Sequence, residues 1–153
     1  MVKSKSGDRR PYNRSMTSGL ILFAHGARDA RWAEPFERLR ERVGQAAPNS
    51  QVALAYLEMM TPDMEAAADA LCAAGCRDIV IVPIFLGQGG HVRQDLPRLL
   101  QNVATRHPEC AFRMVDAAGE DDAVLASIAA YCVRQMGFPT VELKIDRPPK
   151  SLF

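Results

Sequence analysis

The feature that most constrains the fold is an unbroken apolar run at residues 79–86, with the sequence IVIVPIFL. A strand with one solvated face alternates apolar and polar residues, whereas a continuous apolar run is typical of a strand covered on both faces. The glycine-rich stretch GQGG at residues 87–90 ends the run. We therefore expect a sheet that has helices on both of its faces.

Other short strands and amphipathic helices alternate along the chain in a regular order. Three further segments are short and rich in strand-forming side chains: residues 19–24, 51–57 and 110–115. Each of the four strands is followed by apolar residues at helical spacing, within residues 30–46, 61–75, 96–107 and 125–136. This order predicts an α/β fold with a single-lobe, open, four-stranded parallel sheet and two helices on each face.

The second helix has recognisable end signals. Thr61 is the expected N-cap, Pro62 suits the first helical position, and Gly75 is a plausible stop.

We divide the chain into one domain and two tails. A length of 153 residues suits one domain, which we place at residues 18–137. Residues 1–17 are polar and are expected to be mobile. Within residues 138–153, the stretch TVELKID alternates apolar and polar side chains, which predicts a possible C-terminal edge strand. A disordered tail is the alternative, because two prolines follow.

Charge and composition exclude several classes of partner. The net charge of +1 gives no reason to expect nucleic acid or an acidic membrane surface as a partner. No apolar run reaches the roughly 18 residues that a transmembrane helix needs. The polar start has no apolar segment of the length of a secretory signal, so we expect the cytoplasm. The four cysteines fit a reducing compartment. We expect them to be small apolar core residues, and a metal site is the alternative.

Three potential metal ligands follow three successive strands. His25 comes directly after the first strand, Glu58 ends the second, and His91 follows the third. Ligands of open parallel sheets bind beyond the carboxyl ends of the strands, so we expect these side chains to converge. His107 precedes a proline at a helix end, where we expect a structural role.

Three sequence blocks in this order resemble a known family. FAHGARDARWAEPF, ALAYLEMMTPDM and VPIFLGQGGHVRQDLP are similar to the short class II tetrapyrrole chelatases, the sirohydrochlorin cobaltochelatases and ferrochelatases of the CbiX/SirB type. The resemblance covers about residues 19–136. It implies ATP-independent insertion of a divalent metal into sirohydrochlorin, in cobalamin or sirohaem biosynthesis. It also implies that His25 and His91 bind the metal, with Glu58 as the acidic group.

The residue types fit that chemistry. Two imidazoles and a carboxylate suit Co²⁺, Fe²⁺ or Ni²⁺ and leave positions open for the macrocycle nitrogens. An imidazole or Glu58 could accept the pyrrole protons, and the sequence does not assign these roles. No organic cofactor is signalled, because GQGG lacks the Lys–Ser/Thr of a phosphate-binding loop. The FLGQGGHVRQDLP block looks closest to the short cobaltochelatases, which favours cobalt.

Basic and glycine residues beside the two histidine motifs are the candidates for substrate binding. The arginines could pair with the carboxylates of sirohydrochlorin, and the glycines would let the backbone approach its ring. These residues are Arg28, Arg31, Arg93, Gly89 and Gly90. One lobe makes only one wall of a cleft, and the resemblance implies that two copies pair, so we expect a homodimer.

Two other functions remain to be distinguished. A metal or tetrapyrrole carrier that does not catalyse insertion would share every one of these features. A histidine phosphatase also places His–Gly after its first strand, but it needs an arginine directly before the histidine, where this chain has Ala24.

Overall fold

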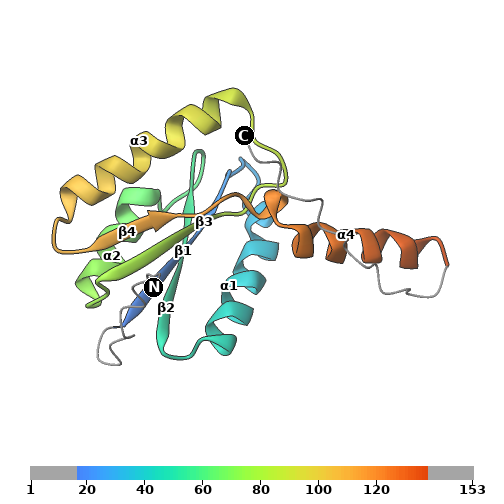
Figure 1. Cartoon of the computed structure of the whole chain (residues 1–153), viewed down its shortest axis with the longest axis horizontal. Helices are drawn as coiled ribbons and strands as arrows, with labels where there is room; N and C mark the ends of the chain where they lie inside the picture. Colours follow the sequence, from blue (N-terminus) through green and yellow to red (C-terminus); the bar gives the residue numbers. More distant parts are fainter. Residues whose placement is uncertain (1–16, 138–153) are drawn as a thin grey trace, which may run out of the picture.

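The computed structural model describes residues 17–137, which form alternating strands and helices (Figure 1). The elements in chain order are β1 (Ser18–Ala24), the short 3-10 helix η1 (Ala30–Ala33), α1 (Glu34–Ala46), β2 (Ser50–Tyr56), α2 (Met64–Ala73), β3 (Asp78–Pro83), α3 (Gly90–Arg106), β4 (Ala111–Met114), the short 3-10 helix η2 (Ala118–Glu120) and α4 (Asp122–Gln135). TVELKID lies outside the described residues, so the edge strand stays a prediction.

All four strands are parallel and lie in the order β2-β1-β3-β4. The predicted α/β fold class with a four-stranded parallel sheet is thereby confirmed. The chain moves from β1 to one side to form β2, then crosses back to form β3 on the other side of β1. The boundary between β1 and β3 is therefore the point where the strand order reverses, which is where ligands of open α/β sheets bind.

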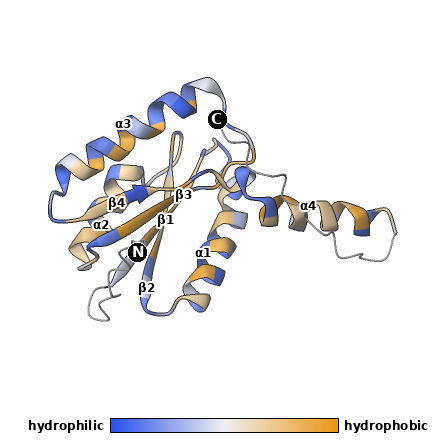
Figure 2. Ribbon diagram, in the orientation of Figure 1, coloured by the Kyte–Doolittle hydropathy of each residue, from blue (hydrophilic) through white to orange (hydrophobic). Residues whose placement is uncertain are grey.

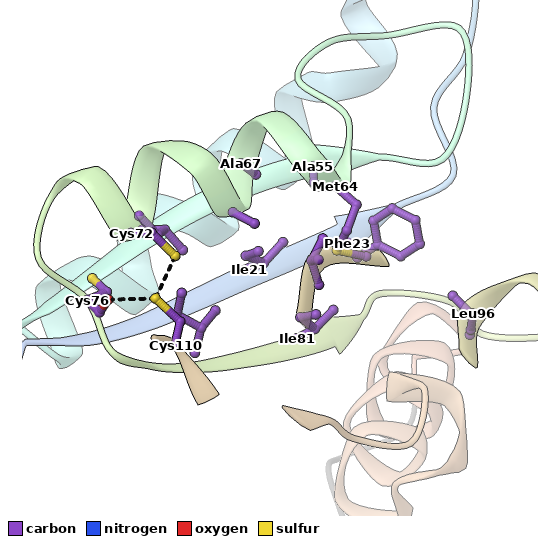
Figure 3. Packing of buried hydrophobic residues seen from close by; sticks show 14 of the residues in the cluster. Ile21, Phe23, Ala55, Met64, Ala67, Cys72, Cys76, Ile81, Leu96 and Cys110 are labelled. Carbon is purple, nitrogen blue, oxygen red and sulfur yellow. Dashed lines mark hydrogen bonds between the residues drawn. The ribbon is translucent and has the colours of Figure 1, made fainter. Parts of the chain in front are cut away.

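The main core lies between the sheet and the helices α2 and α3. Ile21, Phe23, Ile79 and Ile81 are fully buried on this face of β1 and β3, and Met64 of α2 packs with them (Figure 3). Phe23 and Phe85 meet edge to face, with ring centroids 5.9 Å apart. Because two helices cover it, this face has the arrangement that the sequence predicts.

The opposite face of the sheet is covered by α1 alone. Leu22, Leu54 and Tyr56 point toward this face, where Trp32 and Phe36 pack against them. The expectation of two helices on each face is wrong here, since α4 extends away from the sheet and packs mainly on η2 (Figure 1). No residue of α4 is buried.

The start of α2 differs from the sequence prediction. The N-cap is Asp63, whose Oδ1 accepts a hydrogen bond from the Ala66 N–H at 2.8 Å, and the helix begins at Met64. Thr61 and Pro62 instead belong to the preceding loop, in which the Pro62 carbonyl accepts a bond from Tyr56 N–H at 2.9 Å. The predicted stop is confirmed, because Gly75 has a φ of +89° directly after the helix.

The helix α3 begins earlier than its apolar stripe indicates. It starts at Gly90, and Pro97 lies in its interior. Before Leu96 the only large apolar side chain is Val92, so these first turns were not predicted as helix. The strand before it is shorter than the apolar run, because β3 ends at Pro83. His91 consequently lies in the first turn of a helix rather than in a loop.

Three of the four cysteines lie in the core, as apolar packing predicts. Cys72, Cys76 and Cys110 are buried, and the thiols of Cys72 and Cys110 contact each other at 2.8 Å (Figure 3). Burial raises the pKa of the Cys72 thiol to about 12, with the hydrogen bond to Cys110 adding to the effect. Burial also raises the pKa of Cys76.

These raised pKa values predict inert thiols, because the thiolate is the species that reacts with alkylating agents. In the folded protein at pH 8, iodoacetamide should leave Cys72 and Cys76 unmodified, while both should react fully in urea. Peptide mass spectrometry of samples quenched at increasing times checks this. Equal rates with and without urea would show that the two thiols are accessible and ionised in the fold.

No helix within the described range is both long enough and apolar enough to cross a lipid bilayer.

Candidate functional site

The three predicted metal ligands line one cleft at the carboxyl ends of the strands. This cleft has a volume of about 420 Å³, and its described lining comprises His25, Leu57, Glu58, His91, Val92, Asp95, Arg98 and Leu99. The residues come from the ends of β1 and β2 and from α3, which follows β3. The cleft therefore spans the three neighbouring strands β2-β1-β3 and includes the point where the strand order reverses.

Backbone hydrogen bonds continue past the ends of β1 and β2 and position His25 beside Glu58. The N–H of Leu57 donates to the Ala24 carbonyl at 2.9 Å, and the N–H of Glu58 donates to the His25 carbonyl at 3.1 Å. The side chains then approach each other, with His25 Nε2 3.8 Å from Glu58 Oε1. Each of the two side chains is about half exposed, at 49% and 51%, so both are open to an incoming ion.

The ring of His25 also has an apolar neighbour. Its centroid lies 5.7 Å from that of Phe85, in an edge-to-face arrangement. Phe85 is buried and belongs to the main core. The core thus supports one side of an imidazole whose other side faces the cleft.

His91 lines the same cleft, but its ligand atoms and those of His25 and Glu58 are not all within 4.8 Å of one another. Among the described residues, the only three His, Cys, Asp or Glu side chains with ligand atoms all within 4.8 Å of one another are Cys72, Glu109 and Cys110. His25, Glu58 and His91 therefore do not form a closed cage. An open arrangement of this kind suits an ion that is held briefly.

Two charged residues of the cleft were missed by the sequence prediction. Asp95 and Arg98 line it beside His91, and Arg98 Nη2 is 3.1 Å from Asp95 Oδ1. Positions 91, 95 and 98 are spaced i, i+4 and i+7, which places them on one helix face. This spacing was a usable signal, but it requires α3 to begin at Gly90 rather than near Leu96.

The predicted substrate-binding arginines are not gathered in this cleft. Arg31 is bound to Asp29 within its own loop, with Nη2 2.9 Å from Oδ2. Arg93 faces a neighbouring hollow of about 370 Å³, where its Nη2 is 3.8 Å from Glu120 Oε1. Arg28 is exposed and is absent from the described lining of both hollows.

The two predicted glycines lie at the start of α3, next to His91. Gly89 is the N-cap and Gly90 the first helical residue, and no side chain caps this end. A substituent on either glycine would meet no described atom within 4 Å. The first N–H groups of α3 are therefore approachable, and a helix N-terminus favours anionic groups.

His107 lies far from the cleft and has structural partners. It follows α3 as the C-cap residue, and its ring nitrogens are 2.7 Å from Asp69 Oδ1 and 3.3 Å from Glu109 Oε1. Arg106 also binds Asp69. The hydrogen bond from Arg106 is the largest cause that lowers the pKa of Asp69, and the hydrogen bond with His107 is the next. This agrees with the predicted structural role.

The cysteine cluster has poor geometry for a metal. Two thiolates on one tetrahedral zinc ion lie about 3.8 Å apart, since each Zn–S bond is about 2.3 Å. The thiols of Cys72 and Cys110 are 2.8 Å apart, so no ion fits between them without rearrangement. The core-packing interpretation of these cysteines accounts for the arrangement.

A model of the CbiX family matches residues 19–135. The chain belongs to the CbiX family. The match runs from the second residue of β1 to the end of α4, so it includes every residue that lines the cleft.

Curated relatives of this CbiX-family chain include sirohydrochlorin cobaltochelatases of archaea. The one from Methanopyrus kandleri is 28% identical over 81 residues, which is 53% of this chain and 57% of the relative. The one from Saccharolobus solfataricus is 33% identical over 82 residues, 54% of this chain and 62% of the relative. The aligned stretches thus span about three fifths of the relatives' length.

Solved structures of similar proteins have the same fold. A CbiX protein from Marinobacter aquaeolei, described as a putative cobalamin biosynthesis protein, has a TM-score of 0.70 and 28% identity, covering 78% of this chain and 98% of that one. SirB from Bacillus subtilis, solved with Fe³⁺, has a TM-score of 0.68 and 23% identity, covering 81% of this chain and 49% of that one. The CbiX-family chain therefore corresponds in fold to about half of SirB.

Proposed function

We propose that this chain is a metal chelatase that inserts a divalent metal into sirohydrochlorin without ATP. The observation that carries the proposal is the convergence of His25, Glu58 and His91 on one open cleft at the strand ends. The chain's membership of the CbiX family and its similarity to sirohydrochlorin cobaltochelatases support the same reaction.

In the proposed reaction the three side chains hold the metal as a substrate. His25 and His91 supply neutral nitrogen ligands, and Glu58 supplies an oxygen or orients His25, from which it is 3.8 Å away. Two imidazoles and a carboxylate bind Co²⁺, Fe²⁺ or Ni²⁺ and leave positions for the macrocycle nitrogens. As the ion is transferred, His25, His91 or Glu58 accepts the protons that leave the pyrrole nitrogens.

The substrate's carboxylates would bind around the cleft opening. The N-terminus of α3, with Gly89 and Gly90, offers backbone N–H groups to such carboxylates. Arg28 is exposed and available, whereas Arg31 and Arg93 would have to exchange their present carboxylate partners for those of the substrate. We add Arg98 to this set, because it lines the cleft itself.

Cobalt is the metal that we favour, with iron and nickel as alternatives. The curated relatives are cobaltochelatases, and solved SirB structures contain iron or cobalt. Cobalt would place the protein in cobalamin biosynthesis, whereas iron would place it in sirohaem biosynthesis. We propose the cytoplasm as the site of action, where free thiols such as the four cysteines stay reduced.

A homodimer would complete the substrate cleft. The cleft of one lobe is open, and ligand sites usually enclose most of the ligand surface. The chain matches about half of SirB, so two copies would supply two lobes.

Anaerobic mixing of the protein with sirohydrochlorin and each divalent metal in turn tests the function. The absorption spectrum of the macrocycle reports insertion. With one of the metals, the rate of insertion should exceed the spontaneous rate many-fold, and product should accumulate beyond one equivalent per chain. Binding of metal or macrocycle without turnover would instead identify a carrier.

A further inference from the structure

An apolar groove lies open on the face of the sheet that α1 covers incompletely. It has a volume of about 700 Å³, and its floor is formed by Leu20, Leu22, Val82 and Ile84 of β1, β3 and the residue after β3. One wall is formed by α1, and the end of the groove reaches η2 and the first turn of α4. The remaining lining residues are Leu39, Val43, Val115, Asp116, Ala117, Ala118, Glu120, Asp121 and Val124. The groove occupies the position where a second helix would complete this layer.

The helix α4 has an apolar face with no described surface against it. Leu125, Ile128 and Tyr131 are 45%, 38% and 56% exposed. Figure 2 shows apolar colouring along α4, which extends away from the sheet. Leu125, Ile128 and Cys132 follow helical spacing and share one side of the helix, while the exposed Ala123 lies on the opposite side. Most of the stability of a helix in a protein comes from packing such a face, so α4 requires a partner surface.

The start of α4 directs the helix away from the groove of its own chain. Asp121 is the N-cap, and its Oδ1 accepts bonds from the N–H groups of Ala123 at 2.9 Å and Val124 at 3.0 Å. Only Val124, in the first turn, borders the groove. Bringing the rest of α4 into its own groove would require this capped turn to open and reverse. The groove of a second copy needs no such change.

We infer that two copies of the chain exchange α4, with each helix lying in the groove of the other copy. The exchange is reciprocal, so one two-fold axis relates both contacts. A helix of 14 residues is about 21 Å long, and two such helices in two grooves would bury on the order of 1,500 Å², the size of a stable interface. This arrangement specifies how the homodimer of the proposed function assembles, but its test does not depend on catalysis.

A matched pair of charge substitutions on α4 tests the interface. Ile128→Glu places a carboxylate on the apolar face, and Ala123→Glu places the same group on the opposite, exposed face. Sedimentation velocity over a range of concentrations should show a wild-type dimer whose dissociation constant rises about 100-fold in Ile128→Glu, because an unpaired charge is costly in an apolar site. Ala123→Glu should change the dissociation constant less than about threefold. A monomeric wild type, or equal behaviour of the two variants, would overturn the inference.

Cysteine cross-linking identifies the helix that occupies the groove. Cys132 is exposed on α4, and Val43→Cys would place a second thiol in the groove wall. A short bifunctional maleimide should link Cys132 to position 43 between chains, as shown by mixed isotope labels in the linked peptides. Glu41→Cys, on an exposed position of α1, is the control and should give little of this product. A link formed within one chain would show that α4 occupies its own groove and would refute the exchange.

A chain ending at Gly137 tests whether residues 138–153, rather than α4, occupy the groove. The exchanged dimer should persist in it, because α4 is retained in full. Loss of the dimer and of the Cys132 cross-link would assign the groove to residues 138–153 and overturn the inference. Metal binding at His25, Glu58 and His91, measured by calorimetry, should continue in all of these variants, so that failure of the dimer is separable from failure of the proposed function.

Discussion

Replacement of both His25 and His91 by alanine should abolish metal insertion and leave the fold intact. The two imidazoles are the neutral nitrogen ligands of the proposed site, and without them the ion loses its strongest ligands there. Both residues are exposed, so the free energy of unfolding should change by no more than about 0.5 kcal/mol. The rate of insertion into sirohydrochlorin and the urea midpoint measure the two effects.

The third histidine provides the matched control. His107→Ala should lower the urea midpoint, because it removes the contacts of the ring with Asp69 and Glu109, yet insertion should persist. Glu58→Gln should reduce metal affinity roughly 10–100-fold if Glu58 orients His25. Insertion faster than the spontaneous rate in the His25→Ala/His91→Ala variant would place the metal elsewhere.

The sequence predicted the elements whose apolar pattern is set by local geometry. The continuous run at residues 79–86 predicted a strand covered on both faces. Ile79 and Ile81 are buried on one face of β3, whereas Val82 on the other face borders the open groove. The position of His25, Glu58 and His91 after successive strands predicted that they share one cleft, because parallel strands all end at the same edge. Such inferences need only the direction and order of the strands.

Side-chain pairings, the start of a helix without an apolar stripe, and packing partners could not be predicted in this way. Arg31 looked available for a substrate, but Asp29 binds it two residues away. The first turns of α3 have no apolar stripe, so Asp95 and Arg98 were not placed in the cleft. The apolar stripe of α4 predicted a helix correctly, but a stripe does not specify which sheet, or which copy of the chain, it packs against.

The second large effect is expected from a residue that carries no side chain. Gly26 has a φ of +91°, and a Cβ at this position would overlap the carbonyl oxygen of Glu58. That carbonyl belongs to the loop that places Glu58 beside His25, and it also accepts a bond from Met60 N–H at 2.8 Å. The absence of a side chain at Gly26 therefore allows the ends of β1 and β2 to come together.

Gly26→Ala should accordingly lower both stability and metal affinity. We expect a loss of about 2–4 kcal/mol in the free energy of unfolding, from left-handed strain of about 1–2 kcal/mol plus displacement of the Glu58 loop. Moving Glu58 away from His25 should weaken Co²⁺ binding about 10-fold or more. Urea denaturation and calorimetric titration of Co²⁺ measure these changes.

Two other glycines separate strain from steric overlap. Gly75 has nearly the same φ, +89°, but a Cβ there would meet nothing within 4 Å, so Gly75→Ala should show the strain alone and leave Co²⁺ affinity unchanged. Gly87→Ala, in open space without a positive φ, should change neither quantity by much. If Gly26→Ala lost no more stability than Gly75→Ala and kept full affinity, contact between the two loops would not be what positions Glu58. Weaker Co²⁺ binding in Gly26→Ala alone would tie the metal site directly to this backbone contact.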